Sequence, residues 1–387
     1  MSRHVQSLFP ELEEGPATEH STGILPSQKL RELIEGGYIH SDLPIEPEQV
    51  QPSSLDLRLG KTAHRVRASF LPGSNSTVAS KLEAYTEEVI SLETPQQLFK
   101  GSVYVVPLQE EVSLPEHISG RANPKSTTGR LDIFTRLITD YGHEFESVKA
   151  GYRGKLYVEI VPGTFHIVAR MNDRLNQLRL SRGIPSASDA SLTELDQVER
   201  LVYSDDELPV DALIDRGLVF SVDLGGNQNS GIIGYRAKKG APVIDLSRIG
   251  HYDPSHFWVP IQQSPRRDLV LNPEEFYILA SREKVRIPPQ YAAEMIPYDP
   301  SVGEFRIHYA GFFDPGFGYG IDDIKGTRAV LEVRSHEVPF LLEDGQRVGR
   351  LTFERLMGVP DILYGRGIGS SYQSQGLALS KHFKQPQ

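Results

Sequence analysis

A short polar run in the first half of the chain carries side chains that could do chemistry. It reads Pro-Lys-Ser-Thr-Thr-Gly-Arg over residues 124–130. Lys125, Ser126 and Arg130 supply an ammonium, a hydroxyl and a guanidinium, and this combination suits a polyphosphate or an attacking water. The same run is also what a polar turn after a strand contains. A chemical role therefore needs a partner elsewhere in the chain.

The candidate partner is a carboxylate in a strand pattern nearer the C-terminus. Residues 329–333, Ala-Val-Leu-Glu-Val, alternate in a way that places Glu332 on the less apolar face of a strand. A lone strand glutamate is usually exposed or salt-bridged. A second carboxylate, Asp314, precedes a Pro-Gly pair, and any turn favours aspartate at such a place.

The strand pattern occurs twice. Residues 156–160, Leu-Tyr-Val-Glu-Ile, place Glu159 at an offset of 173 from Glu332 (332 − 159 = 173), and flanking apolar positions keep that offset. Residues 54–60 have a weaker echo at residues 221–225. We infer that one β fold has been duplicated.

The elements that must position these residues are short β segments. Apolar runs alternate with Gly, Pro, Asn and Asp in both halves, which predicts an antiparallel sandwich or barrel. Short helices are predicted to begin at Ser27, as an N-cap, and at a capping box over residues 191–194. The predicted fold is mainly β with few helices, in two tandem domains. Its predicted parts are a flexible tail at 1–22, domains at 23–185 and 186–358, and a C-terminal tail at 359–387.

Composition narrows the class of protein. The chain has 387 residues, no cysteine and a formal net charge of −10. The lack of cysteine excludes the thiolate zinc centre of the common nucleobase deaminases. The acidic balance argues against a nucleic-acid partner. No apolar run approaches the length of a membrane span and no signal-peptide pattern is present, so we expect a cytoplasmic protein without a membrane partner.

Together these motifs resemble the zinc-independent dCTP deaminases of the trimeric dUTPase superfamily, in double length. The resemblance extends from Gly23 to the C-terminus and rests on the order and spacing of four motifs. These are Ser54, Asp56, Arg58, Leu59 and Gly60 in the first, Ser126 and Arg130 in the second, Asp314-Pro315-Gly316 with Glu332 in the third, and Tyr364, Tyr372 and Gln375-Gly376 in the tail. The resemblance implies two tandem dUTPase-like domains, each a β-barrel or sandwich of the β-clip type.

The two halves depart from the family pattern at complementary places. The first half has Lys149-Ala150-Gly151 in place of Asp-Pro-Gly, although Glu159 is present. The second half has Asp-Pro-Ser-Val-Gly-Glu over residues 299–304 in place of the Ser-x-x-x-Arg block. Because sites in this superfamily resemble seams between subunits, we predict one composite site per chain and a degenerate second site around Glu159. Whether the seam lies within one chain or between two stays open.

The resemblance implies hydrolytic deamination of dCTP to dUTP and ammonia, in the biosynthesis of dUMP and dTTP. Without zinc, the base must be a carboxylate whose pKa is raised by burial, and Glu332 is the candidate. Ser126 and a backbone carbonyl near Ala310 would hold the water. Arg130 would orient that water and offset the charge of the intermediate.

Substrate-binding roles are implied in the same way. Asp314 would accept a hydrogen bond from the sugar hydroxyl. The phosphates would arrive with Mg²⁺ and bind one set of residues, and the tail would close over the nucleotide. The phosphate-binding set is Lys125, Thr127 and Arg58, and the tail set is Tyr364, Tyr372 and Gln375. We expect no tightly bound cofactor and no zinc. Arg58 has an alternative role, which is to pin the sheet to a neighbouring segment.

Two other functions stay open. The chain could be a dUTP pyrophosphatase, or a bifunctional enzyme, because Tyr152-Arg153-Gly154 is a turn of the kind found in dUTPases and Asp314 could activate a water for phosphoryl attack. Glu332 favours the deaminase, since the pyrophosphatase does not require it. The chain could also be a catalytically inert nucleotide-binding regulator. The expected partner is the small molecule dCTP, and both a homo-oligomer and a self-contained monomer are compatible with the sequence.

Overall fold

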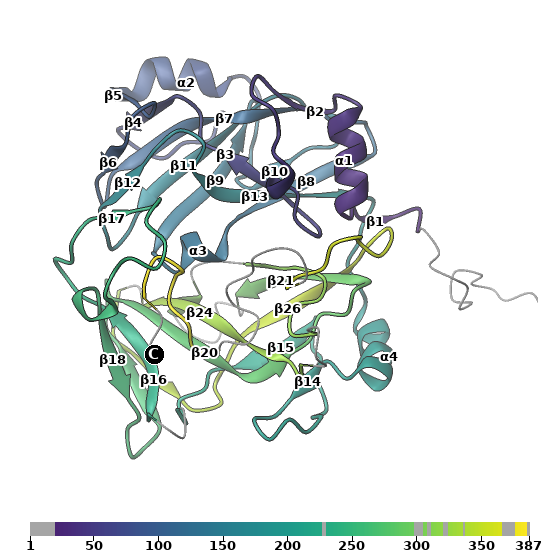
Figure 1. Cartoon of the computed structure of the whole chain (residues 1–387), viewed down its shortest axis with the longest axis vertical. Helices are drawn as coiled ribbons and strands as arrows, with labels where there is room; N and C mark the ends of the chain where they lie inside the picture. The colour runs from purple at the N-terminus through teal and green to yellow at the C-terminus, as the bar shows by residue number, and fades with distance from the viewer. Residues whose placement is uncertain are drawn as a thin grey trace, which may run out of the picture.

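The computed structural model describes residues 20–226, 230–297, 305–307, 311–319, 324–335, 337–365 and 376–384 of the chain. Two β-rich domains lie one above the other, one built from each half of the chain (Figure 1). Antiparallel sheets dominate both domains and the helices are few and short, which confirms the predicted mainly β class with tandem domains.

The first domain contains two antiparallel sheets. One consists, in spatial order, of β1 (Gly23–Ile24), β13 (Arg174–Arg182), β8 (Ile118–Pro124) and β10 (Ser147–Val148), with β3 (Leu55–Arg58) paired to β13. The other consists of β5 (Thr86–Ser91), β4 (Thr62–Val66), β7 (Val103–Ser113), β11 (Arg153–Pro162) and β9 (Ile133–Thr139), with β2 (Ile39–Ser41) paired to β7. A small sheet joins β6 (Gln96–Leu98), β12 (Ile167–Ala169) and β17 (Ile244–Asp245).

The second domain repeats this arrangement. One sheet consists of β15 (Leu218–Ser221), β26 (Arg347–Arg355), β21 (Tyr291–Pro297) and β23 (Phe312–Phe313). The other consists of β18 (Trp258–Gln262), β16 (Ile232–Ala237), β20 (Phe276–Val285), β24 (Thr327–Ser335) and β22 (Phe305–Ile307), with β14 (Val202–Tyr203) paired to β20. The strands β19 (Asp268–Leu271) and β25 (Phe340–Glu343) form a pair.

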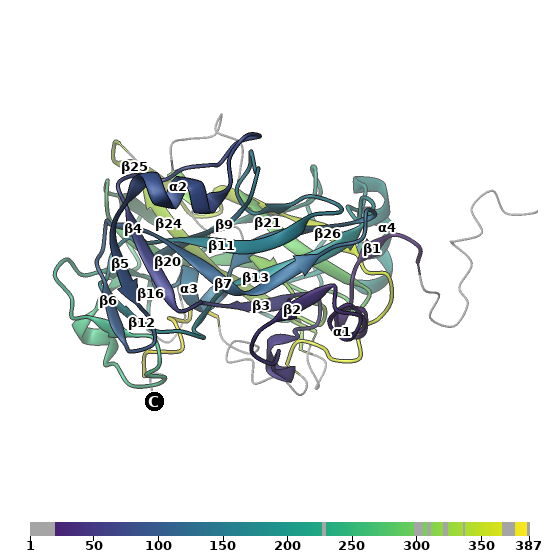
Figure 2. The same ribbon diagram turned by 90° about the horizontal axis from the view of Figure 1, so that it is seen from above.

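The helices of the described residues lie outside the sheets or between the domains. They are α1 (Ser27–Glu35), α2 (Val78–Tyr85), α3 (Ser126–Gly129) and α4 (Asp189–Glu199), with 3₁₀ turns η2 (Pro47–Gln49) and η3 (Pro254–His256). Figure 2 shows α2 along one long side of the molecule and α1 on the opposite side. None of these helices is long and apolar enough to cross a membrane.

Strand register confirms the duplication around the two glutamates. Glu159 on β11 lies opposite Val105, and Glu332 on β24 lies opposite Ile278. Both residues of the second pair stand 173 positions after those of the first (332 − 159 and 278 − 105). The two strands are therefore the same element of one fold.

The predicted echo of residues 54–60 at residues 221–225 is wrong in register. Leu59 bridges Leu108, and Val222 bridges Ser281, which is the position equivalent to Leu108 (281 − 108 = 173). Leu59 therefore corresponds to Val222, and the local offset is 163 (222 − 59). The segments that follow this motif differ in length between the two halves. The apparent match, residue 54 with residue 221, therefore has an offset of 167 and is four positions out of register.

Two helix starts also differ from the sequence expectation. The helix α4 begins at Asp189, because Ser188 is its N-cap: the Ser188 backbone is extended and its side chain accepts from the backbone N–H of Ser191. The capping box predicted at residues 191–194 lies inside the helix. The N-cap of α1 is Pro26, whose backbone is extended, and Ser27 is its first helical residue.

One apolar cluster joins the two domains. Phe165 of the first domain packs edge-on against Phe257 and Trp258 of the second, with ring centroids 5.8 and 5.6 Å apart. Residues 238–257 connect β16 to β18 and reach the first domain, where β17 pairs in parallel with β12 (Figure 1). Since buried rings and a shared sheet both cross the boundary, the halves form one body.

Polar contacts also cross the boundary. The Arg121 guanidinium lies 2.9 Å from the Glu294 carboxylate, and the Asn123 side chain donates to the same carboxylate at 3.2 Å. Arg121 and Glu294 are equivalent positions of the two halves (294 − 121 = 173) on the equivalent strands β8 and β21. Because a residue can touch its own equivalent only near the axis that relates the two copies, this contact lies close to that axis.

Candidate active site

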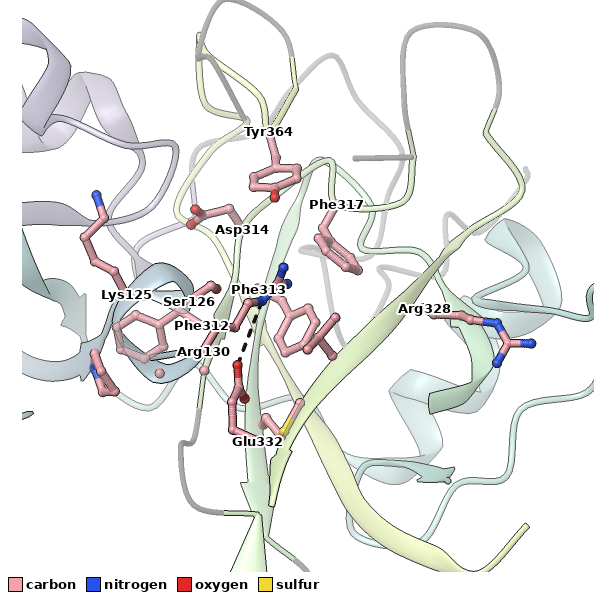
Figure 3. Close-up of a pocket in the computed structure, with 15 residues that line it drawn as sticks. Lys125, Ser126, Arg130, Phe312, Phe313, Asp314, Phe317, Arg328, Glu332 and Tyr364 are labelled. Carbon is pink, nitrogen blue, oxygen red and sulfur yellow. Dashed lines mark ion pairs between the residues drawn. The ribbon is translucent and has the colours of Figure 1, made fainter. Parts of the chain in front are cut away.

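A pocket lies at the seam between α3 of the first half and β23 and β24 of the second (Figure 3). Its wall combines polar groups from both halves with three phenylalanines. The lining residues are Pro124, Lys125, Ser126, Gly129, Arg130, Met295, Gly311, Phe312, Phe313, Asp314, Phe317, Arg328, Val330, Glu332 and Tyr364. The phenylalanines Phe312, Phe313 and Phe317 form the apolar part of the wall.

The carboxylate at the base of the pocket is Glu332. It is only 6% exposed, and its Oε1 lies 4.0 Å from the Arg130 Nε. Burial raises the pKa of Glu332 from its ordinary 4.5 to about 7, while Arg130 works in the opposite direction. Near neutral pH this group can therefore both accept and return a proton.

The short helix α3 presents the polar run to the pocket. The run turns because β8 ends at Pro124 and the Lys125 carbonyl accepts from the N–H groups of Thr128 and Gly129, at 2.8 and 3.0 Å. The turn leaves Ser126 exposed at the pocket and buries Arg130. The structure brings Ser126 and Arg130 to the same pocket as Glu332, and their roles in catalysis stay predictions (Figure 3).

Asp314 follows β23 and is held by the first half of the chain. Its Oδ1 accepts from the Ser53 hydroxyl at 2.7 Å and lies 3.7 Å from the Arg179 guanidinium. Burial raises the pKa of Asp314, and Arg179 and the Ser53 hydrogen bond oppose that rise. Arg179 also stacks on the Phe312 ring, 3.9 Å from its centroid. This carboxylate thus depends on side chains from the other domain.

Lys125 extends from the pocket toward the first domain. Its ammonium pairs with the buried carboxylate of Asp56 on β3. Burial lowers the pKa of Lys381, and the positive charge of Lys125 lowers it further. The motif residue Asp56 therefore fixes a lysine at the mouth of the pocket, where a phosphate chain could bind.

The other predicted binding residues differ in their placement. Tyr364 lines the pocket, its ring 5.5 Å from that of Phe317. Thr127 lies on α3 beside the pocket lining and accepts at its backbone oxygen from the Ser380 hydroxyl. Ala310, Tyr372 and Gln375 lie outside the described residues.

Arg58 has the contacts of its alternative role. It is 3% exposed and does not line the pocket. Its guanidinium donates to Glu110 at 2.7 Å and to the backbone oxygens of Pro44 and Leu43 at 2.9 and 3.2 Å. A phosphate would have to displace these partners, because they hold the side chain inside the first domain.

Glu159 is enclosed by its own domain. It is fully buried, and its Oε1 accepts from Arg136 Nε and Nη2 at 3.0 and 2.5 Å. Arg136 in turn stacks on Phe145, 3.7 Å from the ring centroid, and donates to Ser69. Apolar residues of α2 and the preceding segment cover this face of the sheet. The geometry supports a degenerate second site.

Sequence reasoning missed the residues that organise the seam. Arg179 and Ser53 carry no motif, and their partners stand more than a hundred positions away. Arg328 was also missed. This residue lines the pocket, but its guanidinium points away from it, and Nη2 donates to Asp205 Oδ1 at 2.7 Å (Figure 3). Only Asp56 had a signal, because it lies inside the first motif.

The fold and the site together define a tandem dUTPase-like protein with an acid and arginine pair buried between its halves. Residues 21–184 match the model of the 2'-deoxycytidine 5'-triphosphate deaminase N-terminal domain, and residues 188–383 match that of the C-terminal domain. The chain belongs to the dCTP deaminase family.

Individual relatives agree with this assignment. A structure of 2'-deoxycytidine 5'-triphosphate deaminase from Agrobacterium tumefaciens is 48% identical, with a TM-score of 0.82 over 88% of this chain and 100% of that one. The "dCTP deaminase, dUMP-forming" of Methanothermobacter thermautotrophicus is 30% identical over 138 residues, 35% of this chain and 67% of the relative. That of Aquifex aeolicus is 29% identical over 181 residues, 47% of this chain and 87% of the relative, which is therefore about half as long as this chain.

Proposed function

We propose that this chain hydrolyses the C4 amino group of dCTP, releasing ammonia, at the pocket between its halves. The observation that carries the proposal is the buried Glu332 carboxylate. Its Oε1 lies 4.0 Å from the Arg130 Nε, and burial raises the pKa of Glu332 to about 7. A deaminase needs such a group, because one proton must leave the attacking water and protons must reach the ring and the departing nitrogen.

The proton steps can be assigned to Glu332. The carboxylate takes a proton from a water whose oxygen adds to C4, and returns it to the ring nitrogen N3. The tetrahedral intermediate then transfers its remaining hydroxyl proton, through Glu332, to the amino nitrogen, which leaves as ammonia as the C4 carbonyl forms. The sum is dCTP and water giving the uracil nucleotide and ammonia. Arg130 offsets the negative charge that develops on the oxygen.

The remaining polar groups bind the substrate in this proposal. Ser126 holds the attacking water by its hydroxyl, and Asp314 accepts from the sugar hydroxyl. Lys125 contacts the phosphates, whose Mg²⁺ arrives as part of the substrate. Closure of the tail by Tyr364, Tyr372 and Gln375 stays a prediction.

We propose dUTP as the product. The second candidate is dUMP with pyrophosphate, and it is favoured by the names of the curated relatives, which are dUMP-forming. The two outcomes differ in whether a water also attacks the phosphate chain, for which Asp314 is the candidate base.

Product analysis tests the proposal. Purified protein is incubated with dCTP and Mg²⁺, and ammonia, dUTP, dUMP and pyrophosphate are measured separately. Ammonia with equimolar dUTP is the expected result. Ammonia with dUMP and pyrophosphate means the bifunctional enzyme, cleavage of dUTP without any reaction of dCTP means a pyrophosphatase, and binding of dCTP without ammonia means an inert regulator.

A further inference from the structure

The C-terminal segment 376–384 contacts the arginine of the proposed site. Arg130 Nη1 donates to the backbone oxygen of Ala378 at 3.1 Å, while Nε of the same guanidinium faces Glu332. Ala378 is 5% exposed, so this contact is buried. Two different nitrogens of the Arg130 side chain are therefore engaged by two elements of the second half, β24 and the C-terminal segment.

The segment is also tied to α3 through a buried serine. The Ser380 hydroxyl donates to the Thr127 backbone oxygen at 3.0 Å and lies 2.9 Å from His382 Nδ1. The His382 Nε2 lies 3.0 Å from the Leu246 oxygen. Burial lowers the pKa of His382 to about 4, so at neutral pH its one N–H donates from Nε2 to Leu246. Nδ1 is then an acceptor, and it shares the single hydroxyl proton of Ser380 with the Thr127 oxygen. Ser380 is fully buried at the junction of these groups.

A socket in residues 246–258 holds the far end of the segment. Phe383 is 1% exposed and packs against Phe257 and Trp258, with ring centroids 5.2 and 5.9 Å away. Backbone N–H groups of Gly250 and His251 donate to the oxygens of Lys381 and His382, both at 2.9 Å. Because this socket belongs to the connection that pairs with the first domain, the segment is fixed relative to α3.

We propose that residues 378–383 are a positioning element for Arg130, in addition to the tail motif that ends at Gly376. The Ala378 carbonyl holds the guanidinium in the orientation that faces Glu332, and Ser380 sets the distance between the segment and α3. Arginine has many rotamers, and orientation of a reacting group is worth large factors in rate. This inference rests on the proposed deaminase function.

The test compares two serine substitutions that lie close together. Ser380→Ala removes the bond to α3 without removing packing volume. Ser247→Ala is the matched control, because Ser247 is exposed on the same socket and its hydroxyl donates to Asp245 and not to the segment. We measure kcat and KM for dCTP, together with Tm. We expect Ser380→Ala to lower kcat roughly tenfold or more with KM within about threefold, and Ser247→Ala to change neither.

A guanidinium rescue separates positioning from packing. In Arg130→Ala, millimolar guanidinium ion should restore part of the activity with saturation, because Glu332 and the Ala378 carbonyl are left to hold it. In Arg130→Ala with Ser380→Ala, saturation should need several times more guanidinium. The inference is overturned if Ser380→Ala changes only Tm or only KM, or if the rescue is equal in both backgrounds. If the wild-type protein itself releases no ammonia from dCTP, the proposed function has failed instead.

Discussion

Glu159 and Glu332 occupy equivalent positions on equivalent strands, and their arginine partners differ in distance and origin. Arg136 comes from the adjacent strand and binds Glu159 at 2.5 to 3.0 Å, whereas Arg130 comes from the other domain and stands 4.0 Å from Glu332. Glu159 is thus held in a close ion pair with Arg136, whereas burial raises the pKa of Glu332 to about 7 against the opposing effect of the more distant Arg130. The first arrangement suits a structural pin and the second a proton carrier.

The titration of Glu332 predicts how activity depends on pH. The base form exists above the pKa of about 7, so kcat/KM for dCTP should rise with pH up to that value and then level. At pH 6 it should be roughly ten times below the plateau. Glu332→Gln should lower turnover by roughly 10² to 10⁴ and abolish the rise. A profile that is flat between pH 6 and 8 in the wild-type protein would remove Glu332 from the proton steps.

Substitutions of the two glutamates should have opposite effects on stability, because burial raises the pKa of Glu332 whereas Glu159 forms a close ion pair with Arg136. The folded-state pKa of Glu332 lies above its ordinary 4.5, so stability is lost as pH rises from 4.5 through about 7. Glu332→Gln removes this loss and should raise the free energy of unfolding at pH 8 by on the order of 3 kcal/mol, with little gain near pH 4.5. Glu159→Gln loses the ion pair with Arg136 and should lower the free energy of unfolding by roughly 2 kcal/mol.

Urea denaturation at pH 4.5 and pH 8 measures the free energy of unfolding of Glu332→Gln and Glu159→Gln. Ammonia release from dCTP by the same two variants serves as the control. Glu159→Gln should keep wild-type turnover, because that carboxylate is enclosed by its own domain. Loss of turnover in Glu159→Gln would mean that the first half holds a working site. Destabilisation by Glu332→Gln at pH 8 would contradict the cost assigned to its burial.

At the scale of elements, one arginine connects strands that the sequence gives no reason to join. Arg179 on β13 donates to backbone oxygens of β21 and β23, at Ala293 and Phe313, and to the Glu354 carboxylate on β26. It also contacts Ser53 and so reaches the group that holds Asp314. The placement of β23, and with it one wall of the pocket, depends on this side chain.

Replacement of Arg179 tests that dependence. Arg179→Lys keeps the charge but loses the planar fork, so several buried acceptors lose their donor. We expect the free energy of unfolding to fall by roughly 3 kcal/mol and KM for dCTP to rise through the displaced Asp314. Denaturation and steady-state kinetics measure the two effects. Unchanged KM in a destabilised variant would show that β23 is placed by other contacts.

The elements show what sequence patterns can and cannot predict. Alternation identified the strands that carry Glu159 and Glu332, and the complementary motif losses predicted that α3 would face Glu332. The register of the first motif was not predictable, since its local offset of 163 differs from 173 elsewhere. Arg179 and Ala378 could not be found, because a backbone contact or a single buried arginine leaves no motif.

At the scale of the whole molecule, both halves of one chain line the pocket. Arg130 and Glu332 come from different halves and face each other in the same polypeptide. Ser126→Ala and Glu332→Gln should each lower turnover at least about a hundredfold, and an equimolar mixture of the two proteins should show no recovery, because every chain still lacks one group. The measurement is ammonia release after mixing and long incubation. Recovery toward a quarter of wild-type activity or more would place the working seam between chains.

The contact between Arg121 and Glu294 has a consequence for the origin of this architecture. Two identical subunits that meet about a twofold axis set each residue near the axis beside its own copy, so a cation there would face a cation. Encoding the two copies separately, as this double-length chain does, allows each to mutate on its own. Opposite charges at matched positions are thus a change that duplication made possible.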